Sequence, residues 1–179
     1  MPLTYVTFIS GGVPELPGEA RVNTYRVLSD GGSMCRVETP APFEIPGALR
    51  GVAQHLHYTT AEERADLTAR SRTELSPGVT AVLIPIRKSE AWWQMAHDQR
   101  GHHFHAKGGH TAIGTPYADK IFRKLYHARY LGSGFDFLTY FEFPDAEENA
   151  FRKLLAELRT TEEWSFVEDE YEVWMRKLT

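Results

Sequence analysis

The second half of the chain contains a strand–helix–strand pattern that leaves few folds open. The segment FDFLTYFEF, Phe135–Phe143, is rich in aromatic residues and is the strongest predicted strand. Asp145 with Glu148 predicts a capping box for the helix that follows. One face of that helix carries apolar residues at i, i+3, i+4 and i+7, namely Phe151, Leu154, Leu155 and Leu158. The segment Trp164–Met175 then alternates like a strand, so a helix must pack on the sheet that these strands form.

The remaining predicted elements extend this α+β pattern. Further strands are predicted at Leu3–Ser10, residues 21–29, Leu49–Thr59 and Val79–Ile86. Helices are predicted at Ala61–Ser71 (with Thr60 and Glu63 as a capping box), at Glu90–Arg100 with Ser89 as the capping residue, and at Thr115–Arg129. Three prolines make Thr39–Ala48 a loop. We expect one compact unit of two ferredoxin-like halves, a shortened first half at 1–87 and a second at 88–179, in a barrel type of fold.

Composition excludes several classes of protein. The chain has 179 residues and a net charge of −4, which gives no electrostatic reason to bind nucleic acid or an anionic membrane. Its single cysteine, Cys35, rules out an intrachain disulfide and CxxC motifs. No apolar run is long enough to span a bilayer, and the N-terminus has no basic region of the kind that opens a signal peptide. We therefore expect a cytoplasmic protein.

Histidines are concentrated in one region, with six of the eight between His97 and His127. The segment HHFHAKGGH suggests zinc, but it has no HExxH motif and no cysteine nearby. His102, His103 and His105 are therefore expected on a solvated loop. His110 follows two glycines and precedes a predicted helix. It can coordinate a haem iron, or it can be a helix cap or a core residue with satisfied hydrogen bonds.

Arg123 falls within the predicted helix Thr115–Arg129. The apolar stripe of that helix consists of Tyr117, Ile121, Phe122 and Leu125. At 100° per residue, Arg123 lies roughly opposite this stripe, which predicts a solvated side chain. It can face a ligand only if the helix is covered on both sides.

Two pairs of adjacent residues have open interpretations. Trp92 and Trp93 start a helix in PIRKSEAWW, and their side chains point about 100° apart. One of them can line an apolar pocket, or both can pack between helix and sheet. Glu162 and Glu163, in RTTEEW, stand at a helix-to-strand junction, where exposed charges are the rule.

Taken together, these segments resemble the chlorite dismutase family of haem b enzymes, in its short-chain branch. The resemblance covers roughly Leu49 to the end of the chain. It depends on five motifs in the family's order: LRGVAQHLHYT, PIRKSEAWW, HTAIGTPYADKIFRKLYHAR, FDFLTYFEF and LRTTEEWSFVE.

The resemblance implies a role for each matched residue. His110 matches the proximal ligand of the haem iron, and Arg123 matches the distal catalytic arginine. Glu162 matches the carboxylate that accepts the other N–H of the histidine, with Glu163 as the alternative. Lys88 matches a lysine of the same network. Trp92 or Trp93 matches a residue that lines the haem pocket, and a weaker match places Tyr58 near the propionates.

The resemblance also implies an activity. We expect haem b-dependent decomposition of chlorite, a small anion, to chloride and dioxygen, by a homodimer. A haem peroxidase or a porphyrin-processing relative is the alternative within the enzyme class. A haem-binding module without turnover is the alternative outside it.

Overall fold

The computed structural model describes residues 4–53, 61–62, 65, 69, 71, 73–105 and 109–179. Its strands are β1 Thr4–Ser10, β2 Arg21–Val27, β3 Ser33–Thr39, β4 Leu49–Ala53, β5 Thr80–Lys88, β6 Phe122–His127, β7 Phe137–Phe143, β8 Val167–Glu170 and β9 Val173–Lys177. Its α-helices are α2 Glu90–Gln94, α3 His97–His105, α4 His110–Gly114 and α5 Glu148–Leu158. Short 3-10 helices are η1 Thr115–Tyr117, η2 Asp145–Glu147 and η3 Glu162–Phe166.

The strands form one antiparallel sheet that closes on itself. Its order is β7-β6-β4-β1-β3-β2-β9-β5-β8, and β5 also pairs with β7, which completes the ring. β8 and β9 follow each other along the same edge of β5. The order β4-β1-β3-β2 is repeated by β9-β5-β7-β6, so both sets of four strands have the ferredoxin-like arrangement. The α+β fold is confirmed, whereas the division after residue 87 stays a prediction.

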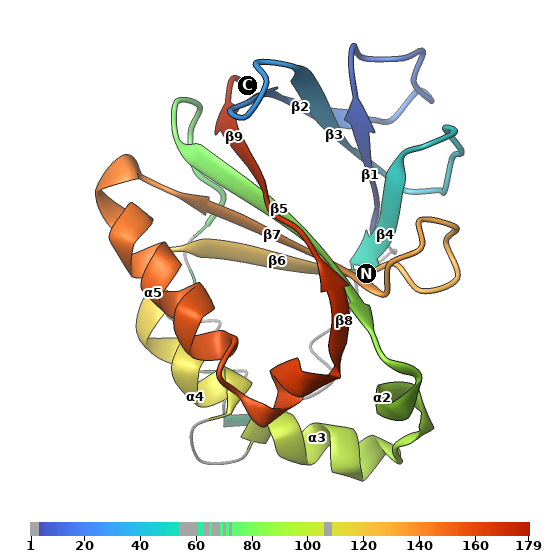
Figure 1. Cartoon of the computed structure of the whole chain (residues 1–179). Helices are drawn as coiled ribbons and strands as arrows, with labels where there is room; N and C mark the ends of the chain where they lie inside the picture. The colour runs from blue at the N-terminus through green and yellow to red at the C-terminus, as the bar shows by residue number, and fades with distance from the viewer. Residues whose placement is uncertain are drawn as a thin grey trace.

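The two faces of the sheet pack differently. Alternate residues fill the inside of the barrel, among them Val6, Phe8, Leu83, Leu138 and Met175. Opposite residues of β5 and β7 pack outside against Phe151, Leu154, Leu155 and Leu158 of α5. Figure 1 shows α4 and α5 together beside β5, β6 and β7, with β1 to β4 on the other side of the molecule. The predicted helix face is therefore confirmed.

The barrel interior also holds buried charges. We call the set Arg36, Glu38, Glu74, Lys124, Glu142 and Lys177 the barrel ion cluster. Lys177 Nζ donates to Glu142 (2.8 Å) and Glu74 (3.0 Å), and Lys124 Nζ donates to Glu38 (2.7 Å). Arg36, Glu38, Glu142 and Lys177 are buried, Glu74 and Lys124 are partly exposed, and each charge has a partner of opposite sign, as buried charges require.

Most predicted strands are confirmed. Three features of the structure differ from the prediction: two concern strands and one concerns a helix cap. β3 was not predicted. Residues 164–175 are not one strand: η3 covers their start, and β8 and β9 follow. The capping box is also wrong, because Asp145 Oδ1 accepts hydrogen bonds from Thr80 (2.9 Å) and Arg176 (2.8 Å) instead of capping α5.

The other predicted helices are confirmed only in part. Ser89 does cap α2 by accepting from the backbone N–H of Trp92, but the helical segment breaks after Gln94 and restarts as α3. His102, His103 and His105 lie in α3 and not on a loop. Tyr58, Thr60 and most of Ala61–Ser71 lie outside the described residues. Within the described part of the chain, no helix has the length and apolar character needed to cross a membrane.

The predicted helix Thr115–Arg129 is wrong, and this error matters most for the site. After η1 the chain forms β6, which pairs with β7 from Phe122 opposite Glu142 to His127 opposite Phe137. The apolar spacing of four between Ile121 and Leu125 fits a strand as well as a helix, since four is an even number. Pairing with β7 decides between them, and both faces of β6 are covered, which hides the strand alternation.

Candidate functional site

A cavity of about 440 Å³ lies between the outer face of the sheet and the helical layer. β5, β6 and β7 form one wall, and α4, α5 and η3 contribute to the other. Apolar side chains predominate in the lining, among them Ile84, Ile86, Leu125, Phe141, Leu155 and Trp164. Charged or ionisable side chains join them, among them Lys88, His110, Arg123 and Glu163. A mainly apolar cavity with a few polar groups is the usual form of a ligand site.

Three of these polar side chains form a relay. His110 is the first residue of α4, and its Nδ1 lies 3.0 Å from Oε2 of Glu163 on η3. Lys88, at the end of β5, donates from Nζ to Oε1 of the same carboxylate and to the Glu163 carbonyl oxygen (3.2 Å). The side chains of Lys88 and Glu163 are 3% and 5% exposed. The structure thus brings His110 and Lys88, two predicted site residues, to one carboxylate.

The charges of the relay fix the proton on His110. Burial alone would raise the pKa of Glu163, but the hydrogen bond from His110 and the Lys88 ammonium lower it to about 2. Burial lowers the pKa of Lys88, and the charge of Glu163 opposes this effect. Because Glu163 is ionised, it accepts the Nδ1–H of His110. The lone pair of Nε2 is then left for another partner, such as a metal.

The carboxylate that contacts His110 is Glu163 and not Glu162. The side chain of Glu162 is 78% exposed, and its Oε2 lies 3.6 Å from Nδ1 of His103. Successive residues of a 3-10 helix point about 120° apart, so only one of the two glutamates can face the cavity. The sequence carries no signal that separates two adjacent glutamates, and the packing of η3 makes the choice.

Arg123 lines the same cavity from β6. Along this strand Arg123, Leu125 and His127 line the cavity with the spacing of two that strand alternation gives, and Lys124 between them also contributes to the lining. The Arg123 side chain is exposed, yet the surrounding protein lowers the pKa of its guanidinium against the charge of Glu163. These observations agree if its exposed surface faces the cavity rather than bulk water. Arg123 is thus not the solvated helical residue that its spacing predicts.

The two predicted pocket tryptophans lie behind the cavity wall. Trp92 is buried with its ring 4.6 Å from Nζ of Lys88. Trp93 stacks on Phe137 at 5.9 Å between ring centroids, and it is Phe137 that faces the cavity. The tryptophan in the lining is Trp164, which the sequence analysis did not single out. It follows Glu163 directly, so the RTTEEW motif contained the only available signal for it.

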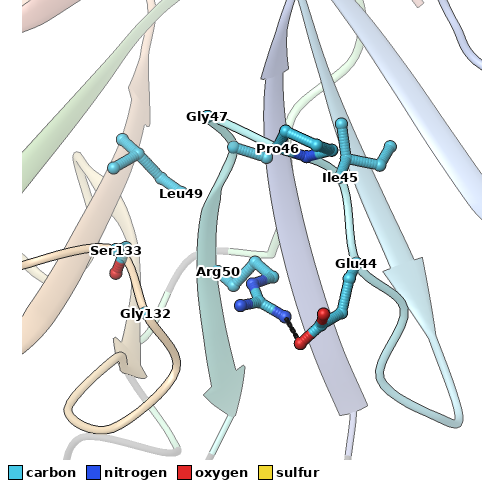
Figure 2. Close-up of a pocket in the computed structure, with 9 residues that line it drawn as sticks. Glu44, Ile45, Pro46, Gly47, Leu49, Arg50, Gly132 and Ser133 are labelled. Atoms are coloured by element: carbon cyan, nitrogen blue, oxygen red, sulfur yellow. Dashed lines mark hydrogen bonds and ion pairs between the residues drawn. The ribbon is translucent and has the colours of Figure 1, made fainter.

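A second hollow of about 300 Å³ lies away from these residues. Figure 2 shows it between the turn at Pro46 and Gly47 and the loop at Gly132 and Ser133. Its charged side chains, Arg50 and Glu44, form an ion pair with each other at 2.8 Å. The relay and Arg123 line the larger cavity, so that cavity is the candidate site.

The fold and the site together define an α+β barrel protein with a histidine–glutamate–lysine relay beside an apolar cavity. The chain belongs to the chlorite dismutase family, because the family model described as chlorite dismutase matches residues 20–177.

Individual relatives agree with this assignment. A chlorite dismutase from Ideonella dechloratans is 30% identical over 118 residues, which cover 64% of this chain and only 39% of that relative. The crystal structure of a dimeric chlorite dismutase from Nitrobacter winogradskyi matches 96% of this chain and 99% of its own, at 35% identity and a TM-score of 0.76. A mutant chlorite dismutase from Candidatus Nitrospira defluvii, 22% identical, shares the fold over 98% of this chain and 92% of its own, with a TM-score of 0.81.

Proposed function

We propose that this protein is a haem b enzyme that decomposes chlorite to chloride and dioxygen. One observation carries the proposal: His110, held by Glu163 and Lys88, lines the same cavity as Arg123. The family supports the activity. This arrangement offers a metal ligand and a fixed positive charge in one apolar space.

The residues of the cavity fit haem b. A flat, largely apolar macrocycle suits the lining of Ile84, Leu155 and Trp164, and the free Nε2 of His110 suits its iron. When bound, haem would supply a redox-active iron for the conversion of chlorite to chloride and dioxygen. We propose His110 as the iron ligand.

Each polar residue then has a separate task. The carboxylate of Glu163 holds the proton of His110 on Nδ1 and increases the basicity of the ring, which favours oxidised iron. Lys88 keeps Glu163 ionised. Arg123 attracts and orients the small anion and retains its charge throughout. The apolar walls exclude water and so strengthen these electrostatic interactions.

We also propose that the protein is a homodimer. The Nitrobacter winogradskyi relative is described as dimeric, and nearly the whole of both chains superimposes. Light scattering during gel filtration would give twice the mass of one chain. A single-chain mass would exclude the dimer.

The deciding experiment measures oxygen release after chlorite is added to the haem-loaded protein. We expect Arg123→Ala to lower the rate by about 10²–10³-fold, the usual loss for one group that stabilises a reacting anion. The exposed Arg26 on β2 provides the control, and Arg26→Ala should release oxygen like the parent. His110→Ala should lose the Soret band of ligated haem.

Other outcomes would redirect the proposal. Haem binding without oxygen release would indicate a peroxidase or a porphyrin-processing relative. A Soret band that His110→Ala leaves unchanged would contradict the ligand assignment.

A further inference from the structure

Asp136 lies outside the cavity lining, but its carboxylate holds three separate parts of the chain together. It is 7% exposed and stands immediately before β7. Its Oδ2 accepts the backbone N–H of Lys88 (2.7 Å) and the indole N–H of Trp93 (3.3 Å). Its Oδ1 accepts an N–H of Arg129 (3.3 Å). One carboxylate therefore connects the end of β5, helix α2 and the loop after β6.

The contact with Lys88 replaces a missing step of the β-ladder. The last paired residues of β5 and β7 are Ile86 and Phe137, and Asp136 N–H donates to the Ile86 carbonyl (2.9 Å). Beyond that point the Asp136 side chain takes the place of a strand and accepts the Lys88 N–H. On the other edge of β5, the pairing with β8 shifts register between Arg87 and Lys88. The backbone of Lys88 is thus fixed by a side chain where regular pairing stops.

The position of Lys88 matters because its ammonium must reach the oxygens of Glu163. Nζ donates to two oxygens of Glu163, and the Trp92 ring covers it at 4.6 Å. A bulge lets a strand re-aim a side chain, and residues at bulges depend on local contacts for their direction. A shift of Lys88 would therefore be transmitted to Glu163 and to its hydrogen bond with His110.

We infer that Asp136 is a positioning residue for this relay: it fixes the end of β5 so that Lys88 reaches Glu163 and Glu163 orients His110. The inference rests on the proposed function only in taking His110 as the iron ligand. Asp136 touches neither the cavity nor the histidine, and it acts through Lys88.

The test compares Asp136→Asn with two reference variants in the full-length, haem-loaded protein. Asn keeps the size of the side chain but replaces one of the two acceptor oxygens with an NH2 group and removes the charge, so at least one of the three donors loses its acceptor and the contacts must rearrange. Resonance Raman spectra of the ferrous protein give the iron–histidine stretching frequency, which follows the strength of the hydrogen bond at Nδ1. We expect a shift to lower frequency in Asp136→Asn, in the same direction as in Lys88→Met.

The control variant is Glu142→Gln. Glu142 is a fully buried carboxylate on β7, the strand that Asp136 precedes, but it faces the barrel and bonds to Lys177 and Tyr140. Its loss perturbs the core without touching Lys88, so the frequency should stay at the parental value. An equal shift in Glu142→Gln would overturn the inference, because the effect would then be general loosening.

A double variant separates positioning from plain structural support. If Asp136 acts through Lys88, Asp136→Asn causes no further shift in the Lys88→Met background. Additive shifts would contradict the inference. Should Asp136→Asn fail to fold, Asp136→Glu keeps the charge and moves the carboxylate by one methylene, and it should shift the frequency as well.

A second measurement keeps this inference distinct from the proposed function. The ring ¹⁵N shifts of His110 in the haem-free, full-length chain report its contact with Glu163 without any turnover. We expect Asp136→Asn to change them and Glu142→Gln to leave them unchanged. Unchanged shifts in Asp136→Asn would contradict the positioning role, whereas missing oxygen release in the parent would contradict only the proposed chlorite activity.

Discussion

Among the residues of the site, the buried carboxylate of Glu163 depends most strongly on its charged and hydrogen-bonding partners. Its carboxylate is nearly inaccessible to water and receives a hydrogen bond from His110 and the ion pair from Lys88. Attraction between buried charges offsets their desolvation only while both partners are present. Removing one of them leaves the other charged and unpaired in the interior.

Glu163→Gln is therefore expected to lower the free energy of unfolding by about 3–5 kcal/mol, the usual cost of an unpaired buried charge. Urea unfolding at neutral pH measures it. The adjacent Glu162 is a matched control, because its side chain is 78% exposed and Glu162→Gln should change stability by less than about 0.5 kcal/mol. Equal losses in the two variants would refute the assignment of Glu163 to the relay.

At the scale of elements, the position of Arg123 depends on how closely β4 approaches β6. Among the described residues, the two strands pair at Val52 with His127 and at Ala53 with Tyr126. Gly51 makes this approach possible, since a Cβ there would lie 2.7 Å from Cβ of Tyr126. A side chain at this glycine would push against the strand that carries Arg123.

Gly51→Ala is expected to lower the free energy of unfolding by about 1–3 kcal/mol through overpacking. It should also weaken the Arg123-dependent oxygen release, because β6 must shift. Gly12→Ala is the control, since no atom lies within 4 Å of the added Cβ. Thermal unfolding of both variants checks this, and a parental midpoint for Gly51→Ala would contradict the close packing.

Helix α5 closes the cavity from the opposite side. Its residue Leu155 is 4% exposed, packs against the outward-facing residues of β5 and β7, and also lines the cavity. Leu155→Ala is expected to cost about 2–5 kcal/mol of unfolding free energy and to speed up haem loss, because the cavity wall recedes. The exposed Lys153 on the same helix gives the control Lys153→Ala. Haem transfer to apomyoglobin measures the loss, and equal rates in both variants would contradict this role of α5.

At the scale of the whole molecule, the barrel ion cluster makes stability depend on pH. Burial alone would raise the pKa of Glu74, but its contacts with Arg36 and Lys177 lower it from 4.5 to about 2. A carboxylate with a lowered pKa stabilises the fold above its unfolded pKa. That contribution is lost as the pH falls from about 4.5 to about 2.

We expect this loss to be on the order of 1–2 kcal/mol for Glu74, because solvent screens its partly exposed carboxylate. Glu74→Gln should be less stable than the parent near neutral pH and should show a shallower decline in acid. Urea unfolding at a series of pH values measures both effects. The exposed Glu15 serves as control through Glu15→Gln, and an unchanged acid slope in Glu74→Gln would contradict the role of the cluster.

The sequence by itself determined the elements whose pattern depends on neighbours along the chain. The apolar face of α5 and the strands β1, β5 and β7 follow from spacing, because one or both faces are buried regularly. The order of motifs also identified the family and placed His110 and Lys88 among the site residues.

Only the tertiary structure decided how those residues meet. Arg123 enters the cavity because β6 pairs with β7, and its even spacing was equally compatible with a helix. Glu163 rather than Glu162 faces His110 because η3 turns one of two identical side chains inward. Trp164 lines the cavity, while Trp92 and Trp93 support it from behind. These choices depend on contacts between residues distant in the chain, which local periodicity cannot encode.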